Sequence, residues 1–540
     1  MRIPRRLPAA LALAASAALI LSSCAAQEQS APAATSDGSP VDGGELVVAI
    51  GNDPVSLNPS GTGSGNDTWN VNRQIVDSLL YQNPETQALE PWLAESYEVS
   101  DDATTFTFHL RDDVTFSDGT PLTAEVVRGT FDDIVAAGAA SQNGASLLVG
   151  YEETVVVDEH TAEVRFAKPN AAFPNSVASV TLGIVGAATF DTAYEERADG
   201  SAVVGSGPFV VDHYTKDVET VLTARDDYAW APEAFGNDGA PHLDEVTFQV
   251  VPEPSVRTGG LVSGQFDAVT GVQPSDQSQV QDAGLTLVDR VNPGLSFGLS
   301  VNVARPAVSD VAVREAIAAA IDPQVVVDTA LNELYSVADS SLSSTTPAYA
   351  SQAERFAYDP EHAAALLDEA GWEEGSDGVR EKDGEPLEIL LLWSTNNSTN
   401  QTVVELVQQQ LAQVGIGVEL VSGTVPEVVE RQASGDFDLS WGNLSRADGD
   451  VLRTTFSSAT TRLGIDDPEL DALLQEQLAV TGDERDAVLA DVQERIASQY
   501  YQIPVHELTS VIGTQLAVHG LQFGADSRLD SLAGTWKDAE

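Results

Sequence analysis

The chain has 540 residues, which is enough for two or three domains at roughly 100–200 residues each. Its 83 acidic and 26 basic residues give a formal net charge of −57, and such a charge repels phosphate backbones, so we expect no nucleic-acid partner. The single cysteine excludes an internal disulfide and a cysteine-based metal site. None of the seven histidines forms a paired ligand motif, so we expect no metal and no cofactor.

The first 23 residues have the pattern of a secretory signal peptide. The chain opens with MRIPRR, and the apolar run that follows is shorter than the about 20 residues that span a membrane. The run ends in Leu21-Ser22-Ser23-Cys24, which resembles the bacterial lipobox, after which the cysteine is lipidated and becomes the new N-terminus. We therefore predict a lipid anchor at Cys24 that holds the mature chain on the extracytoplasmic face of the cell membrane. The alternative is an ordinary signal peptide that happens to contain a cysteine.

Residues 24–43 predict a flexible tether, because Ala, Ser, Pro, Gly and Asp dominate the segment and aromatic residues are missing. Ordered structure is expected to begin in GELVVAIGNDP, where apolar residues between Leu46 and Ile50 predict a buried strand that ends at Gly51. Further along, TFTFHLRDDVTFSDG and TVVVDEHTAEVRFAKP are typical of strands joined by polar turns. These two segments indicate an antiparallel part of the fold.

Three segments in the second half predict helices with their own end signals. SDVAVREAIAAAID repeats apolar residues at helical spacing, and Asp310 can cap its start. DPEHAAALLDEAGW offers Asp359 as N-cap, Pro360 in the first turn and Gly371 as the stop. NQTVVELVQQQLAQVGIGVELV predicts a helix that ends at Gly415, followed by a strand. Such helix-to-strand units favour α/β layers.

One enzyme motif occurs in form, since GLSFG around Ser296 matches G-x-S-x-G. A nucleophile elbow needs a strand, a sharp turn and then a helix. Here the flanking LSFGLSVNV alternates like a strand that continues straight through the motif. We interpret the motif as part of a strand and predict that the protein is not an enzyme. A secreted serine hydrolase that uses Ser296 is the alternative.

The segment from Leu89 to Val127 carries a specific family resemblance. It reads LEPWLAESYEVSDDATTFTFHLRDDVTFSDGTPLTAEVV and closely resembles the signature region of family 5 extracellular solute-binding proteins. These are the peptide, nickel and related receptors of ABC importers. Further segments resemble other motifs of the family, namely GNDPVSLNP, GSGPF from Gly205 to Phe209, SVNVARPAVSDVAVREAIAAAID and AYDPEHAAALLDEAGW. The resemblance extends along nearly the whole mature chain.

The resemblance implies an α/β, two-lobed periplasmic-binding-protein-like fold (class II, large cluster) with an extra subdomain inserted in lobe one. Lobe one would comprise residues 44–60, 205–292 and 505–540, the inserted subdomain residues 61–204, and lobe two residues 293–504. The ligand would lie in the cleft between the lobes, which close by a hinge motion. The implied function is that of a substrate-binding lipoprotein that acts as a monomer and delivers a small solute to the permease and ATPase of an ABC importer. A binding module that senses its ligand for signalling, without transport, is the alternative.

The resemblance also indicates where to look for ligand contacts. The predicted contacts are Trp69, Trp393, Asn396, Asn397, Trp441, Asn443 and Arg446. Peptide receptors of the family hold the amino group of the peptide with an Asp three residues after a Trp, but here Leu444 follows Trp441 at that spacing. Dipeptide receptors also carry an Arg shortly after a strand that ends in Trp, and no Arg follows Trp393. Both absences disfavour free dipeptides and leave longer peptides or capped and neutral solutes.

Arg446 replaces these anchors in the loop that faces the cleft in relatives. A guanidinium presents a planar fork of donors that suits a carboxylate or phosphate, so we predict that Arg446 clamps the ligand. The alternative is a surface salt bridge on a very acidic protein. Nickel import is a further alternative within the family.

Overall fold

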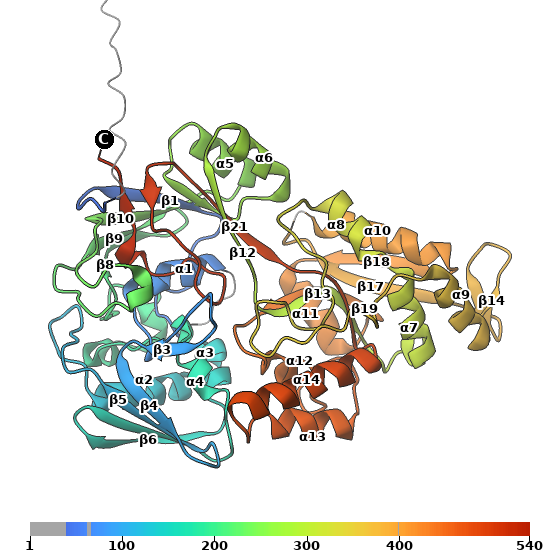
Figure 1. Ribbon diagram of the computed structural model, residues 1–540, viewed down its shortest axis with the longest axis horizontal. Coiled ribbons are helices and arrows are strands. Elements are labelled where there is room, and N and C mark those ends of the chain that lie inside the picture. The colour runs from blue at the N-terminus through green and yellow to red at the C-terminus, as the bar shows by residue number, and fades with distance from the viewer. Residues whose placement is uncertain (1–38, 62–65, 398, 540) are drawn as a thin grey trace, which may run out of the picture. The chain divides into compact units, whose positions relative to one another are not determined.

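The computed structural model of the protein describes residues 39–61, 66–397 and 399–539 (Figure 1). The predicted signal peptide, the lipid attachment site Cys24 and most of the predicted tether lie outside the described residues. Pro40–Ala539 form one compact unit. Within the described ranges, no helix has the length and apolar character needed to cross a membrane.

Three larger β-sheets organise this unit (Figure 1). A seven-stranded sheet has the order β12 (Thr286–Val291), β21 (Thr509–Thr514), β11 (Ala268–Thr270), β1 (Glu45–Ile50), β10 (Glu245–Val250), β9 (Glu219–Ala224) and β8 (Phe209–Thr215). A five-stranded sheet has the order β18 (Gly417–Gly423), β17 (Glu388–Ser394), β19 (Leu439–Ser445), β13 (Gly294–Val301) and β20 (Gln502–His506). An antiparallel sheet has the order β4 (Ala94–Val99), β5 (Thr105–Leu110), β7 (Thr161–Phe166) and β6 (Tyr151–Asp158). We call the seven-stranded sheet with its packed elements lobe one, and the five-stranded sheet with its packed elements lobe two.

Helices and short strands surround these sheets. The helices are α1 (Asn66–Ile75), α2 (Ala124–Ala137), α3 (Gln142–Leu147), α4 (Phe173–Ser176), α5 (Pro254–Val262), α6 (Pro274–Asp282), α7 (Val311–Ala320), α8 (Pro323–Ala330), α9 (Pro360–Glu369), α10 (Asn400–Gln413), α11 (Val425–Ser434), α12 (Val451–Phe456), α13 (Pro468–Glu476) and α14 (Gly482–Ser498). The short strands are β2 (Leu80–Gln82), β3 (Leu89–Pro91), β14 (Glu373–Glu374), β15 (Arg380–Lys382), β16 (Glu385–Pro386), β22 (Val518–His519) and β23 (Trp536–Lys537).

The helix ends predicted from the sequence are confirmed. Asp310 caps α7 by accepting from the backbone N–H of Ala312, and Asp359 caps α9 by accepting from the N–H of His362. Gly371 follows α9 with φ of +85°, in the left-handed region that favours glycine. The predicted strand at Leu46–Ile50 is β1, the central strand of lobe one.

Ser296 lies within strand β13, as the alternation predicted. Its side chain is buried, and its hydroxyl donates to the backbone carbonyl oxygen of Ser340 at 2.7 Å. The strand runs on to Val301, so the sharp strand-to-helix turn of a nucleophile elbow is not formed at this motif.

The chain passes between the two lobes at two short connections. Residues 292–293 link β12 to β13, and residues 507–508 link β20 to β21. In lobe one β12 is the antiparallel neighbour of β21 (Figure 1), and in lobe two β13 is the antiparallel neighbour of β20. The backbone N–H of Asn292 donates to the carbonyl oxygen of Leu508 at 2.7 Å, so the two connections lie side by side. Two adjacent linkers of this length would give the expected hinge motion few backbone angles to change.

The GSGPF turn brings the start of β8 against the end of helix α1. A Cβ atom at Gly205 would lie 2.0 Å from the carbonyl oxygen of Ile75, so this position has no room for a side chain. The N–H of Gly207 donates to the same carbonyl oxygen at 2.9 Å. Helix α1 lies within the predicted inserted subdomain, yet its Val71 and Ile75 belong to the core of the seven-stranded sheet. The domain limits stay a prediction.

Candidate functional site

A cavity of about 430 Å³ lies between the two lobes. Lobe two contributes residues 443–448 and 450, which come directly after or at the end of strand β19. The opposite wall comes from helix α1, from residues within 172–181 and from the C-terminal segment within 524–530. Leu508, at the second connection, closes one side. The volume is in the range of sites for small ligands, about 300–1,000 Å³.

Arg446 is the basic residue that lobe two contributes to the lining of this cavity, beside the acidic residues Asp448 and Asp450. Its backbone N–H donates to the carbonyl oxygen of Pro293 at 3.2 Å, which holds the residue against the first connection. The side chain is half-buried, and its Nη1 lies 3.5 Å from Thr454 Oγ1. Among the residues that the structure describes, no carboxylate forms an ion pair with Arg446.

The charges around Arg446 explain the direction of its pKa shift. Burial lowers the pKa of Arg446 below its usual value. The carboxylates of Asp450 and Asp448 raise this pKa, and the guanidinium groups of Arg453 and Arg528 lower it further. The charge of Arg446 therefore lies in a position where burial and two other cations oppose it and two carboxylates favour it.

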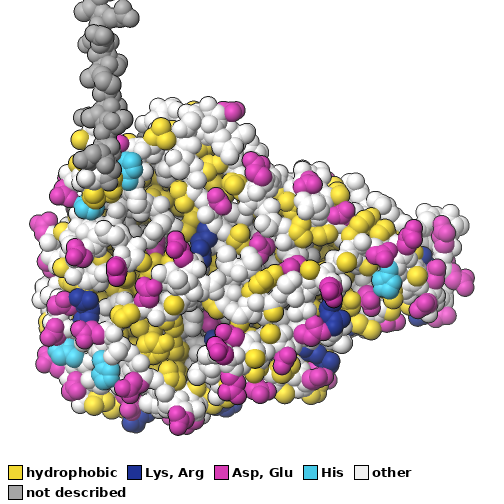
Figure 2. Space-filling model, in the orientation of Figure 1, with side chains coloured by type: hydrophobic (Ala, Val, Ile, Leu, Met, Phe, Trp, Pro, Cys, Tyr) yellow, Lys and Arg dark blue, Asp and Glu magenta, His cyan; other side chains and the backbone are white. Residues whose placement is uncertain are grey.

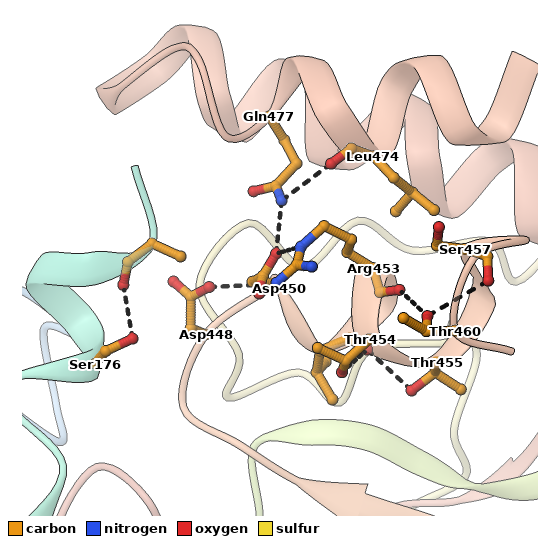
Figure 3. Close-up of polar contacts among 12 residues, drawn as sticks. Ser176, Asp448, Asp450, Arg453, Thr454, Thr455, Ser457, Thr460, Leu474 and Gln477 are labelled. Carbon is orange, nitrogen blue, oxygen red and sulfur yellow. Dashed lines mark hydrogen bonds and ion pairs between the residues drawn. The ribbon is translucent and has the colours of Figure 1, made fainter. Parts of the chain in front are cut away.

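The acidic residues beside Arg446 have partners of their own. Asp448 accepts two hydrogen bonds from Arg485, at 2.9 and 2.7 Å, and both side chains are buried. Asp450 accepts two from Arg453, each at 2.7 Å, and one from Gln477 at 2.7 Å (Figure 3). These bonds neutralise both carboxylates within lobe two and fix the loop that carries Arg446.

The opposite wall presents a second guanidinium. Arg528 stacks over the ring of Trp69, with 4.0 Å between the guanidinium carbon and the ring centroid. Its Nη1 donates to Asp526 at 2.8 Å. Ser176 of helix α4 lies on this wall across from the loop of Asp448 (Figure 3).

A buried carboxylate completes the wall of lobe one. Asp530 accepts from the hydroxyl of Tyr81 at 2.9 Å and from the backbone N–H of Ser531. Burial raises the pKa of Asp530 to about 6, although Arg73 and these hydrogen bonds lower it. Arg73 donates to the hydroxyl of Ser78 and to a backbone carbonyl oxygen, both at 3.0 Å.

The structure brings three of the seven predicted ligand contacts together. Trp69, Asn443 and Arg446 line the cavity. Trp441 is buried in the core of lobe two, where its ring stacks on Phe297 at 5.2 Å. Its Nε1 donates to Asn400 at 3.0 Å, so this donor is used within the lobe.

The remaining three predicted contacts lie at the end of β17 and in the turn that leads to helix α10, apart from the cavity lining. Trp393 is buried in the core of lobe two at the end of β17. Asn397 accepts from the N–H and hydroxyl of Thr399, and Asn396 is exposed in the adjacent turn. The role of all seven residues as ligand contacts stays a prediction.

Sequence reasoning did not single out Arg73, Arg528 or Asp530 as cavity residues. The scarcity of basic residues in this acidic chain is a signal that could have pointed to the two arginines. Asp and Glu side chains are spread over the face in Figure 2, where Lys and Arg are few. With 26 basic residues in 540, a cluster of arginines in one cavity is unusual for this chain. No grouping of three or more His, Asp or Glu side chains suited to a metal ion occurs among the described residues.

Two lobes, a hinge of two short connections and a cavity between them define a two-lobed periplasmic binding protein. Residues 88–461 match the family described as Bacterial extracellular solute-binding proteins, family 5 Middle, and this match spans more than half of the chain. The chain belongs to family 5 of the bacterial extracellular solute-binding proteins.

Two curated proteins and a solved structure are similar to this chain over most of its length. The nickel-binding periplasmic protein of Escherichia coli (strain K12) is 26% identical over 469 residues, which are 82% of this chain and 86% of that protein. The glutathione-binding protein GsiB of Escherichia coli O1:K1 / APEC is 29% identical over 384 residues, which are 70% and 69% of the two chains. The solved structure of the oligopeptide-binding protein AppA from Bacillus subtilis, in complex with a nonapeptide, has a TM-score of 0.76 at 20% identity and covers 93% of this chain and 100% of its own.

Proposed function

We propose that this chain is the substrate-binding lipoprotein of an ABC importer, which captures a small polar solute between its lobes and delivers it to the permease. The cavity between the lobes, with the charge of Arg446 exposed to it, is the observation that carries this proposal. Relatives bind nickel or glutathione according to their names, and a nonapeptide occupies AppA. We propose a peptide-like or other polar solute as the ligand.

The proposal includes binding by hinge closure. A ligand that contacts both walls of the cavity favours the closed arrangement by as much as its affinity differs between the closed and open forms. The permease would then distinguish the closed receptor from the open one. The lobe limits given above, a monomeric state and attachment to the outer face of the membrane through Cys24 belong to the same proposal.

This chain lacks the residues with which peptide receptors of the family anchor a peptide. Their absence supports a ligand other than a free dipeptide. Leu444 stands where peptide receptors of the family carry Asp, and its side chain is 44% exposed. A peptide amino group closed into the cavity at this point would have no carboxylate from Leu444 to pair with, and an unpaired buried charge is costly.

Mass spectrometry of the compound that co-purifies with the protein from its own bacterium tests the binding part of the proposal. The expected result is a stoichiometric small solute, released on denaturation, whose uptake by cells requires this gene and a permease. If the protein binds the solute but cells take up the solute equally well without the gene, the result would instead support a sensor without transport.

A Cys24→Ala variant tests the lipid anchor. The variant should leave the membrane fraction and bind the solute with unchanged affinity, because the predicted tether separates Cys24 from the cavity residues. Retention of the variant in the membrane fraction would refute the anchor. An Ala25→Ser variant controls for changes near the cleavage site.

A further inference from the structure

Two guanidinium groups enter the cavity from opposite lobes. Arg446 comes from the loop after β19 in lobe two, and Arg528 comes from the C-terminal segment packed on lobe one. Both side chains line the same cavity. The charge of Arg528 lowers the pKa of Arg446, after the larger effects of burial and Arg453, which lower this pKa, and of Asp450 and Asp448, which raise it. Arg528 is held in place by the ring of Trp69 and by Asp526, so it cannot turn away freely.

The carboxylates of the cavity leave Arg446 without a partner. Asp448, Asp450 and Asp526 each pair with another arginine at 2.7–2.8 Å. The fourth, Asp530, accepts from Tyr81. Arg446 forms no ion pair within the described ranges, and the desolvation of an unpaired cation is costly.

A neighbouring cavity adds to this positive charge. It has a volume of about 450 Å³ and shares Arg446 and Asp450 with the first cavity. Its lining also includes Lys168 and Arg453. A ligand at Arg446 therefore has room to extend in two directions, and both directions are lined by cations in a chain whose net charge is −57.

We propose that the ligand carries an oxyanion, a carboxylate or a phosphoryl group, which binds between Arg446 and Arg528 and thereby closes the lobes. This inference rests on the proposed function and names its ligand class. Guanidinium groups bind such oxyanions through paired, charge-assisted hydrogen bonds.

The same two residues oppose closure when the cavity is empty. Closure moves two like charges toward each other and out of water, which raises their repulsion. Two hydrogen bonds join the walls of the cavity, from Ala171 N–H to the Leu478 carbonyl oxygen at 2.9 Å and from Gln82 Nε2 to the Ala447 carbonyl oxygen at 3.1 Å. An anion between the arginines reverses the sign of the interaction across the cleft, so closing becomes dependent on the ligand.

The distance between two spin labels across the cleft measures closure directly. The mature chain without Cys24 contains no cysteine, so Val157→Cys and Glu476→Cys, at two exposed positions, provide unique attachment sites. In ligand-free protein at low salt, Arg446→Gln should raise the closed-to-open ratio between about twofold and about tenfold by removing the repulsion. Arg431→Gln, an equal change of charge on the exposed helix α11 of lobe two, should leave the ratio unchanged. Equal ratios in the parent and in Arg446→Gln would overturn the proposal.

Acetate and inorganic phosphate distinguish the two sources of the oxyanion. At ionic strength matched with sodium chloride, one of these probes should raise the closed fraction of the parent more than the other. The apparent affinity of that probe, measured from the closed fraction, should be about 10- to 100-fold lower in Arg446→Gln and in Arg528→Gln. Equal responses of the parent and these variants, including no response in any of them, contradict the proposal. So does a co-purified ligand without an acidic group.

These results separate the inference from the proposed function. If closure depends on Arg446 but uptake does not require the gene, transport is refuted and the anion site stands. Uptake that requires the gene, together with closure that ignores Arg446 and Arg528, would refute the anion site and leave transport in place.

Discussion

Asp77 makes the stability of the protein depend on pH in a direction opposite to that of a paired surface carboxylate. It follows helix α1, is 0% exposed, and accepts from Trp230 Nε1 at 2.8 Å and from the Tyr228 hydroxyl at 3.4 Å. Burial raises its pKa from 3.8 to about 6, and the bond from Trp230 and the charge of Arg73 offset part of that rise. The folded state therefore binds this proton more tightly than the unfolded state does.

The sign and size of the effect follow from the two pKa values. Stabilisation by the bound proton is fully present below about pH 4 and is lost as the pH rises through about 6. The interval between 3.8 and about 6 corresponds to about 3 kcal/mol in the free energy of unfolding. An Asp77→Asn variant does not titrate at this position, so it escapes the loss.

Urea unfolding of the wild type and of Asp77→Asn at several pH values between 4 and 7.5 measures the effect. The free energy of unfolding of the variant, minus that of the wild type, should rise with pH by up to about 3 kcal/mol. Titration of Asp530 is common to both proteins and cancels in the difference. Asp238→Asn, an exposed substitution with the same change of charge, serves as the control. If the difference in unfolding free energy changes by less than about 0.5 kcal/mol over this pH range, or falls as the pH rises, the reasoning is refuted.

Two further substitutions test the packing around the site. Arg485→Ala should lower the free energy of unfolding by about 3–5 kcal/mol, because it leaves the buried carboxylate of Asp448 unpaired, and urea unfolding at neutral pH measures the loss. A loss below about 1 kcal/mol would show that Asp448 is hydrated or finds another partner. Gly205→Ala should cost about 2–4 kcal/mol in the same assay, because its Cβ would overlap the carbonyl oxygen of Ile75, whereas Gly239→Ala, with its nearest atom at 3.7 Å, should be near neutral.

The helix ends could be predicted from the sequence because they depend on neighbouring residues. Asp310 and Asp359 cap their helices through backbone groups two or three residues away, and Gly371 ends α9 through its own backbone angle. The central strand β1 was similarly evident from its apolar residues, since it is buried on both sides. For these elements the local pattern and the tertiary environment point to the same structure.

The cavity could be predicted only in part, because its walls are far apart in the chain. Arg528 and Trp69 stack across 459 positions, and no local pattern in either segment indicates the contact. Trp441 shows the opposite problem, since the family resemblance of its segment predicted it as a ligand contact. Its burial depends on Phe297 and Asn400, which reach it only in the folded lobe. Three-dimensional contacts of this kind decide whether an aromatic side chain packs in the core or lines a cavity.

The charge of the whole chain and the charge of the cavity act in opposite directions on an anionic ligand. A net charge of −57 repels the anion at long range, whereas Arg446 attracts it within the cleft. At physiological ionic strength the long-range part is screened beyond about 8 Å, so the anion can approach the cleft with little opposition. The half-buried pair of Arg446 and Arg528 is screened less than the surface, because closed lobes exclude the salt. Added salt should therefore raise the association rate constant of an anionic solute, whereas its dissociation from the closed form should depend on salt only weakly. A neutral solute would show neither the increase nor this difference between the two rate constants.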